Sequence, residues 1–386
     1  MAPSMRERTS FTGFGNQAAG RNIAAEKPVV MHPAIWGQLP DHLLDRILAL
    51  LPLPVLLSLR PTCPRFHSLL QSPSFLSQLH SRSPSVAYFL LSHPQFSHRF
   101  LILHDTTADS WRKLSIPTYT YSNQLLSCSS GLLCFSVSHP SSSLLVYNLL
   151  MFSSRIVRCP IQSPSSVTLI SKPHRSPHGY KIFLSSSVSN SFFLYDSDSW
   201  SWTSFPLFAP LLSLTNSHQD PVFFNRFLYF TTPEPFSVVG FDLIAKRWET
   251  EVAPQLPPEL AFIRLVSGGG GERLFLIAGI GRDGISRSLK VWELVDGEQR
   301  RWEEVGRLPD LMCRKFVSVC YHNYLHVSCI WHEGMVCVCC TTWSELLVFK
   351  VARGTWHWLP KCPMLQDKWS CGFRWFSFVP DIYAMV

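Results

Sequence analysis

The sequence predicts a small all-α module near the N-terminus, followed by a large all-β domain built of about six similar units. Apolar residues recur at helical spacing between residues 31 and 80. From residue 85 onward they recur instead in short alternating runs bounded by Ser, Pro, Gly and Asn, which is typical of strands. A tryptophan-containing segment then repeats at a nearly constant interval. With 386 residues, the chain is long enough for both parts.

The N-terminal segment is small and polar and has no apolar periodicity, so we expect residues 1–30 to form a disordered arm. It contains no apolar stretch of the kind that a secretory signal requires. The 12 cysteines of the chain are not spaced as a disulfide framework. We therefore expect a reducing compartment, the nucleus and/or the cytoplasm, in which the cysteines serve as small core residues.

The all-α module is predicted for residues 31–80. Asp41 suits the start of its first helix and Pro52 suits the end. The apolar residues of this helix share one face: Leu43, Leu44, Ile47, Leu48 and Leu51. Later prolines can each begin a further short helix. Helices this few and this short cannot bury all of their leucines among themselves, so the surplus favours a face that a partner protein covers.

A membrane-spanning helix is the first alternative for the same leucines. The stretch 43–59 has 17 residues, which is the lower limit for a span. Asp45, Arg46 and two prolines interrupt it, and a central Asp or Arg costs about 2.5–3.5 kcal/mol on insertion. We therefore expect no membrane helix and no membrane partner.

The all-β domain is predicted for residues 81–386, where the sequence shows no long helical window. Its repeat is a strand ending in an aromatic and a polar residue, then a turn, then a second strand with Trp near its start. The repeated tryptophans follow one another at intervals of 46, 54 and 54 residues: Trp202, Trp248, Trp302 and Trp356. Such a period is typical of a β-propeller blade with about four strands, and about six blades fit the domain. We expect a strand within 372–386 to close the first blade and protect its edge.

The aromatic residues of the repeat are predicted to hold neighbouring strands together within each blade. The stretch 146–160 has the same frame, with Ile156 where the other units have Trp. A structural role for these positions is therefore expected in preference to ligand stacking.

Motifs for catalysis and cofactors are weak. The stretch GIGRDG (279–284) matches G-x-G-x-x-G, but a strand follows where a dinucleotide site needs a helix, so we expect a Gly-rich hairpin. A zinc site is the other candidate, formed by His332, Cys337, Cys339 and Cys340. Its spacing is not that of a zinc finger, and strand alternation places Cys340 on the opposite face from Cys337 and Cys339. We predict no catalytic residue, no metal site and no cofactor.

The formal net charge is +8, with a pI of about 8.9, which weakly favours acidic partners. Lys and Arg are scattered along the chain, whereas nucleic-acid-binding proteins usually carry a clustered basic face. We therefore expect a mildly basic surface and no direct contact with nucleic acid.

The helical stretch resembles an F-box. The residues that carry the resemblance keep their spacing: Trp36, the Leu39–Pro40 pair, Leu43, Leu44, Ile47, Leu48, Leu51, Leu53, Pro54, Leu56, Leu59, Cys63, Arg65, Phe66 and Phe75. Phe66 stands where Trp is commoner in the family. The stretch 273–310 resembles a kelch repeat, and SSGLLCF (129–135) followed by VYN (146–148) is typical of the plant members. The whole chain resembles a plant F-box/kelch-repeat protein.

This resemblance implies a non-enzymatic, substrate-recognition adaptor subunit of an SCF (SKP–cullin–F-box) ubiquitin ligase. The F-box would dock on the SKP-family adaptor and reach a cullin through it, while the kelch-type propeller would bind an unknown protein substrate. The expected docking and packing set is Trp36, Leu39, Pro40, Leu43, Leu44, Ile47, Leu48, Leu51, Leu53, Leu56 and Phe66. The opposing hypothesis is that these residues form only the module's own core.

Two other functions are left open. An F-box protein can serve as a transcriptional cofactor that holds a DNA-bound factor on its propeller, and a substrate half-life would separate this role from degradation. A propeller enzyme, with a site assembled from distant residues, would carry a bound metal or redox cofactor. Substrate-binding residues are unknown, and the candidate loops are 171–179 and the loop around Arg282–Arg287.

Overall fold

In the computed structural model of the chain, the described residues are 34, 37–51, 53–59, 62–69, 72, 74–75, 78–79, 87–96, 100–115, 124–137, 142–162, 164–171, 178–185, 191–208, 220–268, 270–296, 300–320, 323–366, 371–381 and 383–386. The arm predicted for residues 1–30 lies outside them. No helix in this described part is long and apolar enough to cross a membrane.

Short helices form where helical spacing predicted them: α2 (Asp41–Leu48), α3 (Leu53–Leu59) and α4 (Pro64–Leu69). The carbonyl of Pro40 accepts the first backbone hydrogen bonds of α2, from Leu43 N at 3.0 Å and Leu44 N at 3.2 Å. Asp41 is the first helical residue, where its charge favours the positive end of the helix dipole. Prolines occupy the first turns of α3 and α4, where a missing N–H costs nothing.

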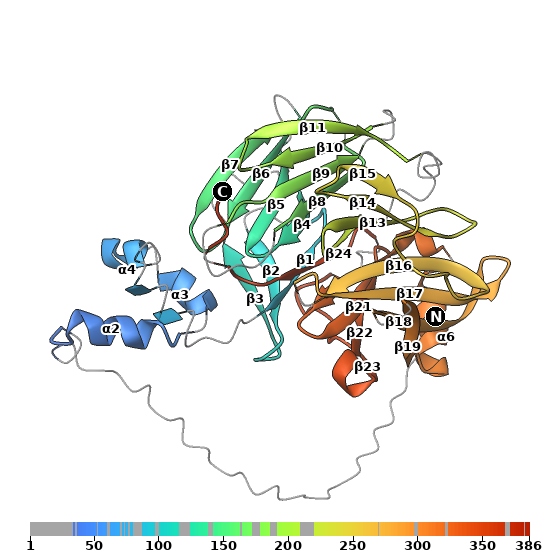
Figure 1. Cartoon of the computed structure of the whole chain (residues 1–386). Helices are drawn as coiled ribbons and strands as arrows, with labels where there is room; N and C mark the ends of the chain where they lie inside the picture. Colours follow the sequence, from blue (N-terminus) through green and yellow to red (C-terminus); the bar gives the residue numbers. More distant parts are fainter. Residues whose placement is uncertain are drawn as a thin grey trace, which may run out of the picture. The chain divides into compact units, whose positions relative to one another are not determined.

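The residues described after the helices form six four-stranded antiparallel sheets, which are the blades of a propeller (Figure 1). Blades 1 to 3 consist, from the inner to the outer strand, of β24 (Arg374–Phe378), β1 (Tyr88–Ser92), β2 (Phe100–Asp105) and β3 (Ser110–Ser115); β4 (Leu125–Ser129), β5 (Leu132–Val137), β6 (Ser143–Asn148) and β7 (Ser153–Arg158); and β8 (Ser166–Ile170), β9 (Lys181–Ser185), β10 (Ser191–Asp196) and β11 (Ser201–Pro206).

Blades 4 to 6 follow in the same order along the chain. They consist of β12 (Val222–Phe224), β13 (Phe227–Thr231), β14 (Val238–Asp242) and β15 (Arg247–Glu249); β16 (Leu260–Gly268), β17 (Arg273–Arg282), β18 (Ile285–Val295) and β19 (Arg301–Arg307); and β20 (Val327–His332), β21 (Met335–Cys340), β22 (Trp343–Lys350) and β23 (Thr355–Trp358). The inner strands touch their neighbours around a common axis, as β4 touches β8 and β16 touches β20. The propeller with six blades is therefore confirmed.

The hydrophobic core lies between the blades. Val146 of blade 2 and Ile182 of blade 3 belong to one buried cluster, and Phe275 of blade 5 and Val338 of blade 6 belong to another. Because each sheet is covered on both faces by its neighbours, its inner strands read as nearly continuous apolar runs.

The propeller is closed by a strand from the end of the chain. β24 pairs with β1, with Leu90 opposite Phe376, so blade 1 is completed by residues that follow blade 6. This confirms the closure predicted for the segment 372–386. The pairing also covers the edge of β1 that would otherwise expose unpaired backbone N–H and C=O groups.

The turn between the third and fourth strands of a blade, here called the outer turn, has the same geometry in several blades. In four blades an Asp or Asn side chain begins the turn and accepts backbone N–H groups at 2.8–3.0 Å: Asp105, Asn148, Asp196 and Asp242. The residue just before the fourth strand has a positive φ, between 44° and 62°, in five blades: Asp109, Phe152, Trp200, Lys246 and Gly354.

The repeated tryptophans occupy equivalent positions on the fourth strands. Trp202, for example, lies opposite Tyr195, with ring centroids 5.2 Å apart, so the predicted packing within a blade is confirmed. The same indole donates from Nε1 to the Arg158 carbonyl of blade 2 at 2.8 Å. Trp248 makes the corresponding bond to the Pro206 carbonyl of blade 3, also at 2.8 Å. These tryptophans therefore also join neighbouring blades, which the sequence did not predict.

In blade 2, the residue at the position of the repeated tryptophans differs from the predicted one. Tyr147 lies opposite Ser154, and Ile156 lies opposite Leu145. The position that other blades give to Trp is therefore Ser154, and the assignment to Ile156 was wrong by two residues. Ser154 follows Asn148 at the same spacing at which Trp202 follows Asp196, so the register is the same in both blades. The assignment went wrong because it followed the apolar pattern and passed over a small polar residue.

A helix within the all-β domain is a second correction. α6 (Asp310–Cys320) lies between β19 and β20 and packs against β18 (Figure 1). Cys313, Phe316 and Cys320 are buried on its inner side, at the i, i+3 and i+7 spacing of one helical face. Cysteines are weak signals of a helix, which explains why no helical window was predicted within this domain.

The predictions for the Gly-rich and Cys-rich segments are confirmed. Arg282 pairs with Ile285 across the two-residue turn Asp283–Gly284, in which both residues have positive φ, so GIGRDG ends a hairpin. Cys337 and Cys339 lie in one buried cluster and Cys340 in another, on the opposite face of β21.

Candidate functional site

The first candidate site is the apolar face of α2. Leu43 and Ile47 lie one helical turn apart, and each is 37% exposed. Leu50, which follows the helix, is 64% exposed and was not among the predicted residues. Large aliphatic side chains left this open are the kind that a partner's groove can cover.

The predicted docking and packing residues differ widely in exposure. Pro40, Leu43 and Ile47 are exposed, and Leu48 and Leu56 are buried. Four more are half-buried: Leu39, Leu44, Leu51 and Phe66. Trp36 and the side chain of Leu53 lie outside the described part of the chain.

The second candidate site is the axial channel, lined by the inner strands of the propeller. Arg374 of β24 donates to two backbone carbonyls of β4, Leu125 at 3.3 Å and Leu126 at 3.1 Å. Burial lowers the pKa of this guanidinium, and the charge of Asp220 opposes the shift. Asp220 in turn accepts a hydrogen bond from Ser166 Oγ at 2.5 Å. The lining of the channel thus holds a cation and a carboxylate, each bonded to a neighbouring blade.

Arg264 of β16 is a second buried cation. It donates from Nε to the Val327 carbonyl at 2.7 Å and from Nη2 to the Tyr324 carbonyl at 2.5 Å. Burial lowers the pKa of Arg264 as well. A third bond runs from Nη1 to the Ile263 carbonyl of its own strand at 2.7 Å. All three nitrogens of the guanidinium therefore bond to backbone carbonyls, so Arg264 joins blade 5 to blade 6 and offers little to a ligand.

The cysteine-rich segment has the properties of a packed core. Burial raises the pKa of the Cys337 thiol, with Cys339 and Cys329 adding to the shift. A thiol held protonated is a poor nucleophile and a poor metal ligand. Within the part of the chain that the structure describes, no group of three or more His, Cys, Asp or Glu side chains is arranged to hold a metal ion.

The two loops predicted as substrate contacts are only partly described. In the loop 171–179, residues 172–177 lie outside the described residues. In the other loop, Arg282 is paired with Glu259, and Arg287 is exposed.

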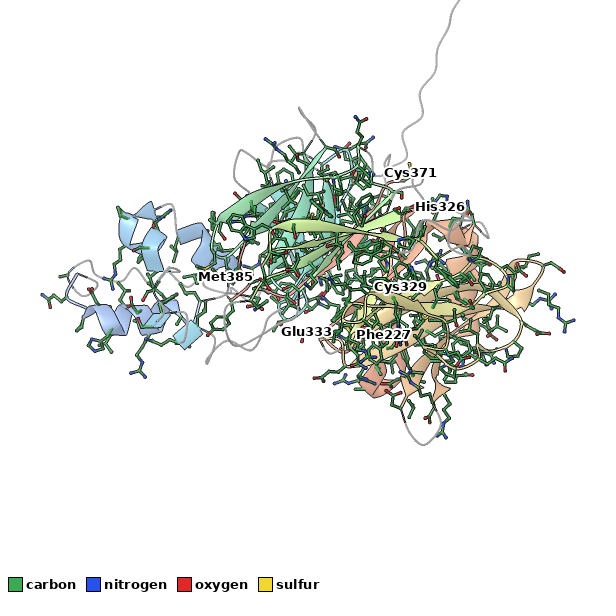
Figure 2. All side chains as sticks on the ribbon, turned by 45° about the horizontal axis from the view of Figure 1, so that its top comes forward. Phe227, His326, Cys329, Glu333, Cys371 and Met385 are labelled. Atoms are coloured by element: carbon green, nitrogen blue, oxygen red, sulfur yellow. The ribbon has the colours of Figure 1, made fainter. Side chains whose placement is uncertain are left out.

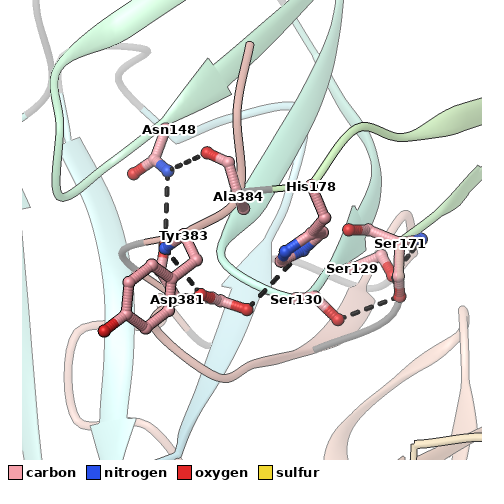
Figure 3. A network of polar contacts seen from close by, with 8 residues as sticks. All are labelled: Ser129, Ser130, Asn148, Ser171, His178, Asp381, Tyr383 and Ala384. Carbon is pink, nitrogen blue, oxygen red and sulfur yellow. Dashed lines mark hydrogen bonds and ion pairs between the residues drawn. The ribbon is translucent and has the colours of Figure 1, made fainter. Parts of the chain in front are cut away.

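A third candidate lies beside the last residues of the chain, here called the C-terminal strap (379–381 and 383–386). Asn148 donates from Nδ2 to the Ala384 carbonyl at 2.7 Å and to the Asp381 carbonyl at 3.2 Å (Figure 3). The backbone of His178 bonds to Tyr383 at 3.1 Å and to Met385 at 3.0 Å. The strap thereby crosses from blade 1 over blades 2 and 3.

Close packing fixes the path of the strap. Gly131 has a φ of +79°, and a Cβ at this position would lie 2.5 Å from the Asp381 nitrogen. Asp381 Oδ2 also lies 3.8 Å from His178 Nε2 (Figure 3). Only glycine fits at position 131 without moving the strap.

Trp200, in the outer turn of blade 3, is a residue that sequence reasoning missed. Its side chain is 67% exposed, and the Arg155 guanidinium lies 3.7 Å from the ring centroid. The signal in the sequence is a second tryptophan two residues before the repeated Trp202. Met385 of the strap, labelled in Figure 2, is 55% exposed. It lines a shallow cavity together with Trp200 and Arg155.

Known proteins resemble the chain along most of its length. A family model described as F-box domain matches residues 36–78. An F-box/kelch-repeat protein of Arabidopsis thaliana is 46% identical over 375 residues, which cover 94% of this chain and 91% of that protein.

More distant relatives have the same extent. ABERRANT PANICLE ORGANIZATION 1 of Oryza sativa subsp. japonica is 29% identical over 393 residues, covering 91% of this chain and 90% of that protein. UNUSUAL FLORAL ORGANS of Arabidopsis thaliana is 27% identical over 377 residues, covering 86% and 80%. An F-box match before a six-bladed propeller, with 46% identity across nearly the whole length, shows that this chain belongs to the F-box/kelch-repeat protein family.

Proposed function

We propose that this chain is a non-catalytic substrate-recognition subunit of an SKP–cullin–F-box ubiquitin ligase, acting in the nucleus or the cytoplasm. The F-box match over residues 36–78 carries the proposal, because F-box domains bind SKP-type adaptors. In this role the helices dock on the SKP-family adaptor, and a cullin is reached through it. The propeller holds the protein to be ubiquitinated.

The exposed aliphatic side chains of the helical region support docking. Leu43 and Ile47 on α2 are spaced as the anchors of a helix that lies in a partner's groove. Complete burial of a Leu or Ile is worth about 1.5–3 kcal/mol, and these two are only partly covered in the chain alone. Leu50 offers further area because it is the most exposed leucine of this stretch. Together they can offset part of the entropy that association costs.

Buried members of the predicted set serve the fold in this proposal. Leu48 and Leu56 are each 5% exposed, so a partner can gain little area from them. We assign adaptor contact to Pro40, Leu43, Ile47 and Leu50, and packing to Leu48 and Leu56.

The adaptor's contribution to ubiquitin transfer is proximity, and it requires no reacting group in this chain. A protein held on the propeller is presented to the conjugating enzyme at a high effective concentration. The closed ring of blades suits this task because it supplies a rigid support for loops at both ends of the axis.

A pull-down of a purified SKP-family adaptor tests the proposal. We compare the wild-type chain with the double variant Leu43→Ser/Ile47→Ser and with His42→Ser/Arg46→Ser, a control on exposed polar residues of the same helix. We expect the first variant to bind at least tenfold more weakly and the control to bind normally, with equal thermal unfolding for all three.

Two results contradict the proposal. One is a wild-type chain that does not bind the adaptor, because the leucines would then form only the core of the helical module. The other is full binding by the Leu43→Ser/Ile47→Ser variant. If binding is confirmed, the half-life of a protein captured by the propeller separates a degradation adaptor from a transcriptional cofactor.

A further inference from the structure

An exposed tryptophan in a strained backbone conformation marks the outer turn of blade 3. Trp200 has a φ of 55°, in the left-handed region that bulky residues rarely adopt. The same position is occupied by Asp109 in blade 1 and by Gly354 in blade 6, both of which tolerate this conformation better. A tryptophan at this position therefore does not stabilise the turn itself.

Packing in the core does not explain the tryptophan at position 200 either. Phe152, at the same position of blade 2, packs edge-on against Tyr147 with centroids 6.2 Å apart. The Trp200 side chain is instead 67% exposed. Strained residues that serve neither turn nor core are concentrated at functional sites.

Arg155 gives this site a positive charge. Its guanidinium lies 3.7 Å from the Trp200 ring centroid, which leaves the N–H edges of the guanidinium free for other bonds. Among the described residues, no carboxylate oxygen forms an ion pair with Arg155. A stacked guanidinium is already ordered, so it pays little entropy when it binds a carboxylate through two parallel hydrogen bonds.

A shallow cavity lies beside this pair. Its volume is about 240 Å³, and its lining includes Arg155, His178, Asp198, Trp200 and Met385. The acidic side chain in this lining is that of Asp198, which is exposed and forms no ion pair with Arg155 among the described residues. His178 is already paired with Asp381 of the strap.

The apolar wall of the cavity is held in place by the strap. Met385 donates its backbone N–H to the His178 carbonyl at 3.0 Å, and its side chain is 55% exposed. Flexible thioethers adapt to varied apolar partners, and Trp and Arg are the residues most enriched where binding energy is concentrated. The cavity thus combines two apolar surfaces with one cation.

We propose that Arg155, Trp200 and Met385 form a docking site for an acidic peptide segment of the protein that the propeller holds. An Asp or Glu carboxylate of the segment bonds to the guanidinium edge of Arg155. A neighbouring apolar side chain covers Trp200 and Met385. The net charge of +8 on the chain favours such a segment over a basic one. Only one part of this proposal rests on the proposed function, namely that the peptide belongs to a substrate protein.

Fluorescence anisotropy with three labelled pools of random 12-residue peptides tests the site on the full chain. The first pool contains Leu and Phe with Asp and Glu, the second replaces the acids by Asn and Gln, and the third replaces them by phosphoserine. We expect the first pool to bind wild type at least tenfold more tightly than the second and no more weakly than the third.

Matched variants assign the binding to the site. Trp200→Gly removes the ring and suits the positive φ, so it should fold as well as wild type, and Arg155→Gln removes the charge. We expect each to weaken binding of the acidic pool at least tenfold. Lys246→Gly changes the same turn position in blade 4 and should leave binding unchanged.

Several outcomes would overturn the site: equal binding of the first two pools, tighter binding of the phosphoserine pool, or full binding by Trp200→Gly. The SKP-adaptor pull-down with the same variants keeps the two proposals apart. If Trp200→Gly binds peptides normally while α2 variants lose the adaptor, only the peptide site is wrong. If the adaptor never binds while the peptide results hold, the site stands and the ligase role fails.

Discussion

The same kinds of apolar residue lie exposed in the helical region and buried in the propeller. On α2, Leu43 and Ile47 remain more than one-third exposed. In the propeller, Phe89, Phe275 and Phe349 are completely buried between blades. The difference shows that a high content of leucine and phenylalanine can serve either a partner or the chain's own core. Which one applies is decided by whether neighbouring elements can close around the apolar face.

Removing the closing strand is expected to have the largest effect on this contrast. A chain truncated before Arg374 loses β24, so it loses the pairing with β1 and the buried side chains of Trp375 and Phe378. We expect no cooperative thermal transition by circular dichroism, because blade 1 then exposes an apolar edge. Removing only residues 384–386 should lower the midpoint and leave the transition cooperative. A truncated chain that melts like wild type would show that the ring does not depend on its closure.

Acidification is expected to weaken the same seam between blades 6 and 1. His332 of β20 is fully buried, stacks on Phe89 with ring centroids 3.7 Å apart, and lies with Nδ1 2.9 Å from Ser377 Oγ. Burial lowers the pKa of His332 to about 3, with a further contribution from His104. His104 is itself bonded to the exposed carboxylate of Asp109.

The sign of the effect follows from these values. In the unfolded chain the pKa of this histidine is about 6.5, so between pH 6.5 and pH 3 the unfolded state binds more protons than the folded state. Stability is therefore lost as the pH falls through this window, by about 2–3 kcal/mol between pH 7 and pH 4.5. Urea unfolding of wild type and His332→Phe should show a shallower pH dependence for the variant. Equal slopes would mean that His332 is already protonated in the folded chain.

The outer strand of blade 2 allows a smaller test that sharpens the contrast. Ser154 occupies the position of the repeated tryptophans, opposite Tyr147. Ser154→Trp should restore the aromatic pair and raise the free energy of unfolding by about 0.5–1 kcal/mol, measured in urea. Ile156→Trp is the matched control and should give no gain, because Ile156 lies opposite Leu145 and not opposite the tyrosine. If only Ile156→Trp raised the free energy of unfolding, Ile156 and not Ser154 would occupy the position of the repeated tryptophans.

Much of the fold could be predicted from the sequence because its signals are local. Strand alternation, turn residues and the tryptophan interval act within one blade, so they indicated the propeller and its closure. The position of Ser154 and helix α6 could not be predicted in the same way. Ser154, which lies opposite Tyr147, is small and polar and gives no aromatic signal. The buried face of α6 is made of cysteines and one phenylalanine, which are weak signals of a helix.

The candidate sites also differ in whether their signal in the sequence is local. The leucines of α2 were found because helical periodicity places them on one face. Trp200 and Arg155 were missed because they belong to different blades and meet only once the ring has formed. Met385 joins them through the strap, whose position depends on Asn148 and His178 far away in the sequence.

The pairing of β24 with β1 also orders events during synthesis. The first blade of the ring receives its inner strand after the strands of all the other blades have been synthesised, so a nascent chain carries an open sheet until β24 has been made. A product that stops early lacks the segment that joins the ends, whatever the condition of its other blades. A chain that stops before β24 therefore has an incomplete propeller.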